Sequence, residues 1–156
     1  MKVLYLGRFQ PFHNGHAAVL DALSDEDVIL VIGSADLERT PENPFSYRER
    51  MEMILRSGYR PFIMLPIADI NNYPMWVGHV ESMVPRFESV VTNNPRDREL
   101  FSTAGYPLHE VPLFSREEYN ATHIRGLIAR DEPWEHLVPP GTVEVVRSIN
   151  VSERFN

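Results

Sequence analysis

The sequence predicts an α/β fold: a Rossmann-like, doubly wound parallel sheet with helices on both faces. Two observations lead to it. Short apolar runs typical of buried strands alternate along the chain with segments of helical periodicity. The first strand, helix and strand together span about thirty residues, as a βαβ unit does. Because the chain has 156 residues, 43% of them hydrophobic, and no linker or repeat, we expect residues 1–156 to form a single domain.

The first βαβ unit lies at the N-terminus. Its strands are predicted at 2–6, "KVLYL", and 27–33, "DVILVIG", because a glycine follows or ends each of these short apolar runs. The helix between them is indicated by four side chains at the spacing of one helical face: His16, Val19, Leu20 and Leu23. Ligands of parallel sheets bind beyond the carboxyl ends of the strands, so we expect functional residues in the loops that follow them.

The rest of the chain continues the alternation. Further strands are predicted at 61–67, 88–94 and 109–114, and further helices at 46–58, 73–84, 95–105, 121–132 and 140–150. Ser46 and Glu49 form a capping box at the start of the helix at 46–58. Arg48 and Arg50 alternate with glutamates there, which is typical of a solvated, salt-bridged face. In the last helix, three side chains are expected to face inward: Val143, Val146 and Ile149.

The composition excludes several classes of function. A formal charge of −7 argues against a nucleic-acid partner held by phosphate contacts. The absence of cysteine removes disulfides, cysteine zinc sites and thiol nucleophiles, and it suits the cytoplasm. No apolar run is long enough for a signal peptide or a membrane span. Because Lys2 is the sole lysine, arginine would have to bind any phosphate, and its planar fork suits that task.

The segment after the first strand, "GRFQPFHNGH" at 7–16, carries the strongest chemical signal. Its glycines let the backbone come close to a ligand, and the positive end of the following helix points at the two histidines. The alternatives are a phosphate site, half of a zinc site and a packed turn with polar caps. Phosphate is favoured, because only two metal ligands are local and so many polar side chains are unusual in a packed turn.

These residues resemble a known family. "HNGH" at 13–16 matches the HxGH signature of the nucleotidylyltransferase superfamily, and the segment at 7–16 resembles the opening of archaeal-type nicotinamide mononucleotide (NMN) adenylyltransferases. A second signature of the superfamily, ISSTxxR, appears in altered form as "YNATHIR", with Thr122 and Arg125 in place and Asn120 and Ala121 instead of serines. Four more stretches are similar, in the right order: 32–54, 69–79, 92–95 and 139–146.

The resemblance implies transfer of AMP from ATP to NMN, which gives NAD and pyrophosphate in NAD biosynthesis. It implies four catalytic residues, with the histidines on the ATP phosphates, His16 nearest the α-phosphate, and the arginines on the β and γ groups: His13, His16, Arg8 and Arg125. The residues implied for ATP are Gly7, Phe9, Gly15, Gly33, Ser34, Asn94 and Thr122, and those for NMN are Asp69, Ile70 and Trp76. Mg²⁺ is expected as cofactor, held mainly by the ATP phosphates and not by a protein metal site.

Several alternatives stay open. An enzyme of the same superfamily with another acceptor, FMN or phosphopantetheine, fits the motifs, as does a non-catalytic nucleotide-sensing domain. Class I aminoacyl-tRNA synthetases share HxGH but need a lysine-bearing loop that is missing here. Trp76 suits either a stacking role on the pyridinium ring or the core, and Gly33, Ser34 and Asn94 suit simple turns equally well. The resemblance also implies a homo-oligomer, and hexamers are common among archaeal relatives.

Overall fold

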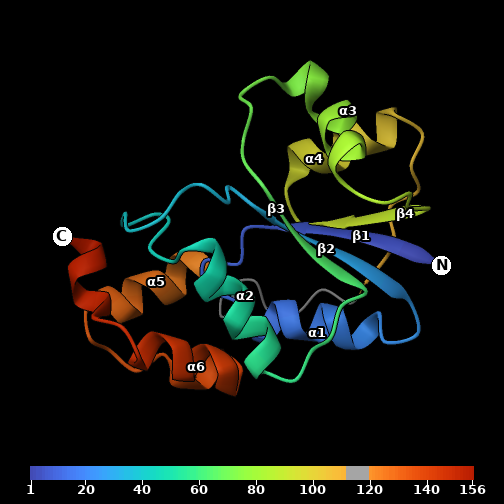
Figure 1. The fold of residues 1–156 in the computed structure, drawn as a ribbon. Coiled ribbons are helices and arrows are strands. Elements are labelled where there is room, and N and C mark those ends of the chain that lie inside the picture. The colour runs from blue at the N-terminus through green and yellow to red at the C-terminus, as the bar shows by residue number, and fades with distance from the viewer. Residues whose placement is uncertain (112–119) are drawn as a thin grey trace. The chain divides into compact units, whose positions relative to one another are not determined.

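The computed structural model describes residues 1–111 and 120–156, which fall into two compact units (Figure 1). The sheet unit consists of Met1–Arg8, Leu23–Ala35 and Pro61–Val111. The helical unit consists of Phe9–Ala22, Asp36–Arg60 and, in its described part, 120–156. The chain passes from one unit to the other several times, and the single domain expected from the sequence stays a prediction.

The sheet unit is built on four parallel strands (Figure 1). These are β1 (Lys2–Gly7), β2 (Asp27–Gly33), β3 (Ile63–Ile67) and β4 (Ser89–Thr92), in the order β3-β2-β1-β4. The register places Leu4 opposite Ile29 on one side and Val90 on the other. The chain winds outward from β1 to β3 and then returns to place β4 on the free side of β1, so the predicted α/β, Rossmann-like fold is confirmed. The topological switch point lies between β1 and β4.

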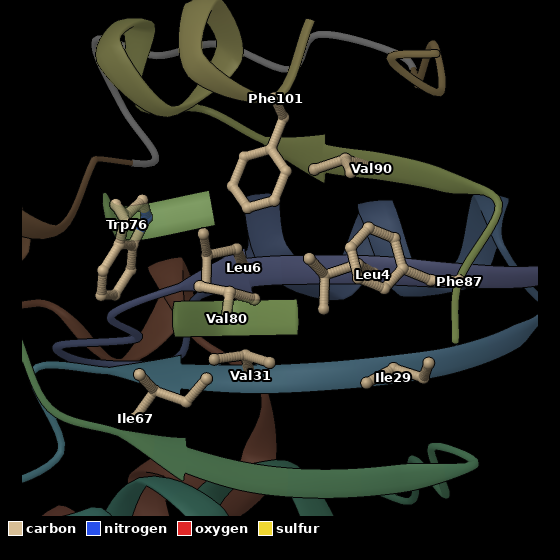
Figure 2. Close-up of a cluster of buried hydrophobic side chains, with 10 residues drawn as sticks. All are labelled: Leu4, Leu6, Ile29, Val31, Ile67, Trp76, Val80, Phe87, Val90 and Phe101. Carbon is tan, nitrogen blue, oxygen red and sulfur yellow. The ribbon is translucent and has the colours of Figure 1, made fainter. Parts of the chain in front are cut away.

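One face of this sheet carries an apolar core together with α3 (Tyr73–Met83) and α4 (Pro95–Thr103). Alternate strand residues take part, because successive side chains of a strand point to opposite faces. Each fully buried side chain of this size stabilises the fold by about 1.5–3 kcal/mol. Figure 2 shows the cluster: Leu4, Leu6, Ile29, Val31, Ile67, Trp76, Val80, Phe87, Val90 and Phe101.

The strand predicted at 109–114 is wrong in its described part. Residues 109–111 form no strand, and 112–114 lie outside the described residues. The chain instead makes one isolated parallel bridge between Leu108 and Val90, flanked by a bond from the His109 N–H to the Val90 carbonyl at 2.8 Å. Pro107 stands just before this bridge and has no N–H to extend a ladder, which explains why the pairing stays short.

The helical unit contains four described α-helices and two 3₁₀ turns. The helices are α1 (Asn14–Ala22), α2 (Tyr47–Arg56), α5 (Ala121–Ala129) and α6 (Pro140–Arg147), and the turns are η1 (Glu135–Leu137) and η2 (Val151–Phe155). The capping box on α2 is confirmed, since Ser46 Oγ accepts from the Glu49 N–H at 3.1 Å and Glu49 Oε1 accepts from the Ser46 N–H at 2.9 Å. Among the described residues, no helix is both long and apolar enough to span a bilayer.

Two details of α2 and α6 differ from the sequence prediction. Arg50, expected in solvent, is fully buried, and its Nε donates to the Ser46 carbonyl at 3.1 Å. In α6, Val146 is buried as predicted, but Val143 is only half-buried, and Ile149, also half-buried, lies beyond the helix end at Arg147. The helix turns a different stripe inward because Gly141 brings its backbone against α2, where a Cβ would lie 2.5 Å from the Met53 carbonyl. That close approach fixes the rotation of α6, and apolar periodicity alone does not reveal it.

Candidate functional site

The two histidines of "HNGH" are folded against each other at the start of α1. His13 stands just before the helix, and its Nδ1 accepts the backbone N–H groups of Gly15 at 3.0 Å and His16 at 3.4 Å. His13 is therefore the N-cap of α1, a task usually performed by serine, threonine, aspartate or asparagine. The His16 ring stacks on the His13 ring with centroids 3.6 Å apart. This arrangement confirms the predicted position of His13 in the loop and of His16 in the first helical turn.

The hydrogen bonds fix the proton on each ring. Nδ1 of His16 accepts the backbone N–H of His13 at 3.0 Å, so both Nδ1 atoms are acceptors. A neutral imidazole that accepts at Nδ1 carries its proton on Nε2. Two Nε2–H donors therefore belong to one helix N-terminus, where the positive end of the helix dipole also favours an anion.

Both rings are neutral at physiological pH. Burial lowers the pKa of His13 from 6.5 to about 4. Burial, and then the neighbouring His13, lower the pKa of His16 well below 6.5. A neutral pair can donate two hydrogen bonds to a phosphate without the mutual repulsion that two imidazolium ions at this separation would suffer.

The second signature lies against the same loop within the helical unit. Arg125 of α5 donates from Nη1 to the Gln10 carbonyl at 2.7 Å and from Nη2 to Thr122 Oγ1 at 3.3 Å. Thr122 is exposed in the first turn of α5. Asn120, which replaces a serine of the family pattern, caps this helix by accepting the His123 N–H at 2.7 Å. The structure therefore brings Arg125, with Thr122 beside it, to residues 9–16, here called the histidine loop.

The loop itself is tightly specified. Phe9 is buried and has a φ of 55°, a left-handed conformation that costs a residue with a side chain about 1 kcal/mol or more. The glycines expected to shape this turn, Gly7 and Gly15, lie at the end of β1 and inside α1, and neither has a positive φ. Gln10 explains how the strained turn is held, because its side-chain amide exchanges two hydrogen bonds with the Phe45 backbone, at 2.8 and 2.9 Å.

A second group of predicted residues gathers at the carboxyl ends of the strands in the sheet unit. Gly7 ends β1 and the exposed Arg8 follows it, while Gly33 ends β2. Ser34, the next residue, is buried with a φ of 47°, and its Oγ donates to Asp69 Oδ2 at 2.7 Å. The loops after β2 and β3 are thereby joined at the sheet edge where α/β proteins bind ligands.

The remaining predicted residues lie on α3, on α4 and in the loop before α3. Trp76 is buried in the core, and its indole N–H has no hydrogen-bond partner among the described residues. Ile70 packs against the same core. Asn94 caps α4, and its Oδ1 accepts two backbone N–H groups. Burial raises the pKa of Asp97, while Arg96 and the nearby N–H of Trp76, which falls short of hydrogen-bond geometry, oppose that rise.

The donors around the histidine loop suit an anion. They are the two imidazole rings and the guanidinium group of Arg125. Within residues 1–111 and 120–156, no three His, Asp or Glu side chains are grouped so that they could hold a metal ion. The chemistry that the loop supports is therefore the binding of phosphate groups and the stabilisation of negative charge on them.

Sequence reasoning missed Gln10 and Thr142, which hold this loop from other parts of the helical unit. Thr142 is fully buried in α6 and donates to the Phe12 carbonyl at 2.7 Å. Gln10 stands inside the motif itself but carries no signal of its own. For Thr142, the available signals are its place in the family-like stretch at 139–146 and a hydroxyl group on the inward side of a helix.

The comparisons with known proteins agree with this chemistry. The cytidylyltransferase-like family model matches residues 4–127. The chain is 44% identical to a nicotinamide-nucleotide adenylyltransferase of Methanocorpusculum labreanum, with 97% of this chain and 94% of the relative covered. It is 41% identical to the protein of that name from Pyrococcus furiosus, with 97% and 86% covered.

Solved structures extend the comparison to the fold. A bifunctional NMN adenylyltransferase/ADP ribose pyrophosphatase of Francisella tularensis, crystallised with AMP and a Mn ion, is similar with a TM-score of 0.77 at 20% identity. The match covers 97% of this chain and 50% of that one, so this chain spans about half of the bifunctional protein. At this level of identity the likeness supports the fold alone.

Proposed function

The chain belongs to the cytidylyltransferase-like family and, within it, to the nicotinamide-nucleotide adenylyltransferases, and from this premise we propose how its residues make NAD. It transfers AMP from ATP to NMN and releases pyrophosphate. The observation that carries the mechanism is the pair of neutral Nε2–H donors on His13 and His16 at the N-terminus of α1.

The reaction needs positioning and charge stabilisation more than proton transfer. The phosphate of NMN is already an anion at neutral pH, so it attacks the α-phosphorus of ATP without a general base. The bond from that phosphorus to the bridging oxygen breaks, and its electron pair leaves with pyrophosphate. Negative charge grows on the α-phosphate and on the leaving group, and fixed donors aimed at these oxygens lower the barrier.

In our proposal the histidine loop binds the ATP phosphates. His16 donates to the α-phosphate from Nε2, and His13 donates to a neighbouring phosphate. Arg8 and Arg125 bind the β and γ groups. Arg125 already gives Nη1 to the Gln10 carbonyl, so it meets the phosphates from a fixed orientation. Thr122, exposed in the first turn of α5, adds its hydroxyl. Phe9 shapes the turn through its positive φ, and Gly7 and Gly15 are assigned to the ATP site at its two ends.

The sheet unit supplies the residues proposed for the rest of both substrates. Asp69, held by Ser34, reads the carboxamide of NMN together with backbone groups near Ile70. Trp76, buried with its N–H near Asp97, is proposed to stack on the pyridinium ring of NMN. Gly33, Ser34 and Asn94 are proposed to contact the adenosine.

A divalent cation accompanies the nucleotide in our proposal, and we assign Mg²⁺. It is held by the ATP phosphates and water, which fits a loop whose donors are N–H groups and not carboxylates. When bound, it neutralises part of the phosphate charge. The homo-oligomer and the cytoplasmic location expected from the sequence stay predictions.

One assay tests the acceptor. Pyrophosphate release is measured with ATP and Mg²⁺, and NMN, FMN and phosphopantetheine are offered in turn. Release with NMN, together with NAD formation, is the expected result. Release with another acceptor but not with NMN would overturn the substrate, and no release with any of them would point to a nucleotide-sensing domain.

A variant tests the role of His16. His16→Ala is expected to lower kcat at least about a hundredfold, as the loss of a charge-stabilising donor does, with a smaller effect on KM for ATP. His109→Ala, in the sheet unit, is the matched control and should keep wild-type turnover. Equal kcat in His16→Ala and wild type would remove His16 from the mechanism.

A further inference from the structure

We propose that Thr142, in the C-terminal helix α6, is a positioning residue for His16 and acts through the peptide group that joins Phe12 to His13. The proposal rests on the proposed function, because it concerns the histidine assigned to the α-phosphate. It assigns a task in the reaction to a residue outside both signatures.

The side chain of Thr142 bonds directly to the backbone of the histidine loop. Thr142 lies in the first turn of α6 and is fully buried. Its hydroxyl donates to the Phe12 carbonyl over 2.7 Å, across 130 positions of sequence. No other donor in the described ranges bonds this buried carbonyl. A buried carbonyl without a partner is costly, so the bond fixes where the Phe12 carbonyl points.

The peptide group between Phe12 and His13 transmits this constraint to His16. The carbonyl of Phe12 and the N–H of His13 belong to the same planar amide, so fixing one fixes the direction of the other. The His13 N–H donates to Nδ1 of His16 at 3.0 Å. A hydrogen bond to the carbonyl also polarises the amide, and a polarised amide is a stronger donor at its N–H. Thr142, the peptide group and His16 therefore form one continuous chain of hydrogen bonds.

The consequence of this constraint concerns the His16 ring. Its Nδ1 must remain an acceptor if Nε2 is to carry the proton that it donates to phosphate. The Phe12 ring, stacked on the His16 ring at 5.9 Å, supports the same orientation from the side. Loss of the Thr142 hydroxyl loosens the amide, and the ring becomes free to rotate or to exchange tautomers. The Nε2–H donor of His16 is then still present, but it no longer points in a fixed direction.

The test uses the full chain and three variants. Thr142→Val keeps the shape and removes the hydroxyl, and Thr142→Ser restores the hydroxyl without the methyl group. Ser57→Ala is the matched control. Ser57 Oγ accepts the Gly141 N–H at 3.1 Å, so the substitution weakens the attachment of α6 to α2 without removing a bond to Phe12. Each protein is assayed for kcat and KM and is examined by ¹⁵N NMR of the histidine rings.

We expect kcat to fall about tenfold in Thr142→Val, the low end of the loss measured when the hydrogen-bond partner of a metal-bound histidine is removed. KM for NMN should stay unchanged, Thr142→Ser should recover most of the activity, and the His16 ring nitrogens should show a changed tautomer in Thr142→Val alone. An equal loss in Ser57→Ala would reduce Thr142 to a packing role. Wild-type kcat and ring signals in Thr142→Val would overturn the proposal.

The NMR measurement also separates this proposal from the proposed function, because it needs no turnover. If the chain makes no NAD but Thr142→Val still alters the His16 tautomer, the hydrogen-bond chain stands and the assigned reaction fails. If Thr142→Val does not fold, the wild-type spectrum decides: a proton on Nδ1 of His16 refutes the proposal directly, and a proton on Nε2 with activity regained in Thr142→Ser supports it.

Discussion

Acidification should lower the stability of this protein through His13. The folded state keeps the imidazole neutral, with a pKa lowered by burial from 6.5 to about 4. Because the folded pKa lies below the unfolded value, the unfolded chain takes up a proton first as the pH falls. The stability linked to His13 is therefore complete above pH 6.5 and is lost progressively from pH 6.5 down to about 4.

The size of the effect follows from the same values. One pKa unit corresponds to about 1.4 kcal/mol, so the lowered pKa of His13 predicts a loss of about 3 kcal/mol between pH 7 and pH 4. This is a large share of the free energy of unfolding of an ordinary domain, which is about 5–15 kcal/mol. Protonation of Nδ1 would also break the cap on α1, because this nitrogen accepts the Gly15 N–H.

The perturbation is His13→Asn, measured by urea unfolding at several pH values between 4 and 7.5. Asparagine removes the titrating ring but can still cap α1 with its side-chain oxygen. We expect its free energy of unfolding to fall less steeply with acid than that of the wild type, by about 3 kcal/mol over the range. His109→Asn serves as control. Parallel pH curves for wild type and His13→Asn would refute the reasoning.

Two further predictions concern stability. Arg154→Met should cost about 2 kcal/mol at pH 7, because Arg154 pairs with both Glu49 oxygens, at 2.8 and 3.1 Å. Burial raises the pKa of Glu49, but these bonds outweigh burial and hold the pKa below 4.5. Urea titrations should therefore show that the substitution costs less stability in acid, where Glu49 is protonated. Gly141→Ala should cost more than about 2 kcal/mol, since its Cβ would meet α2, while Gly78→Ala, with open space around it, should stabilise α3 by up to about 1 kcal/mol. Equal changes in thermal unfolding for the two glycine variants would contradict this contrast.

Much of the fold could be predicted because its signals are local. The capping box on α2 and the glycines that end α2 and α4, Gly58 and Gly105, both at positive φ, read correctly from the sequence. The burial of Arg50 and the rotation of α6 could not be read in this way. The rotation of α6 depends on its packing against α2, which is set by a backbone contact at Gly141. The burial of Arg50 depends on tertiary contacts that a local pattern of charges does not contain.

The candidate site, too, could be predicted from the sequence only where its signals are local. The motif around His13 and His16 predicted a phosphate-binding helix start, and the structure brings Arg125 to the same loop. The direction of each imidazole proton could not be predicted, because it depends on which backbone N–H reaches Nδ1 in three dimensions. The hydroxyl of Thr142 reaches the loop from the opposite end of the chain, where sequence spacing carries no information.

The anchoring of the histidine loop also has a consequence for folding kinetics. Its supports come from Phe45, Arg125 and Thr142, at sequence separations of 35, 115 and 130 residues. Contacts this distant pay the largest loop-closure entropy, so they form late and slowly. We therefore expect the working form of the N-terminal motif to appear only after the C-terminal helix has been synthesised and docked. A chain truncated before α6 would still contain "HNGH" but would lack the Thr142 hydroxyl that orients His16.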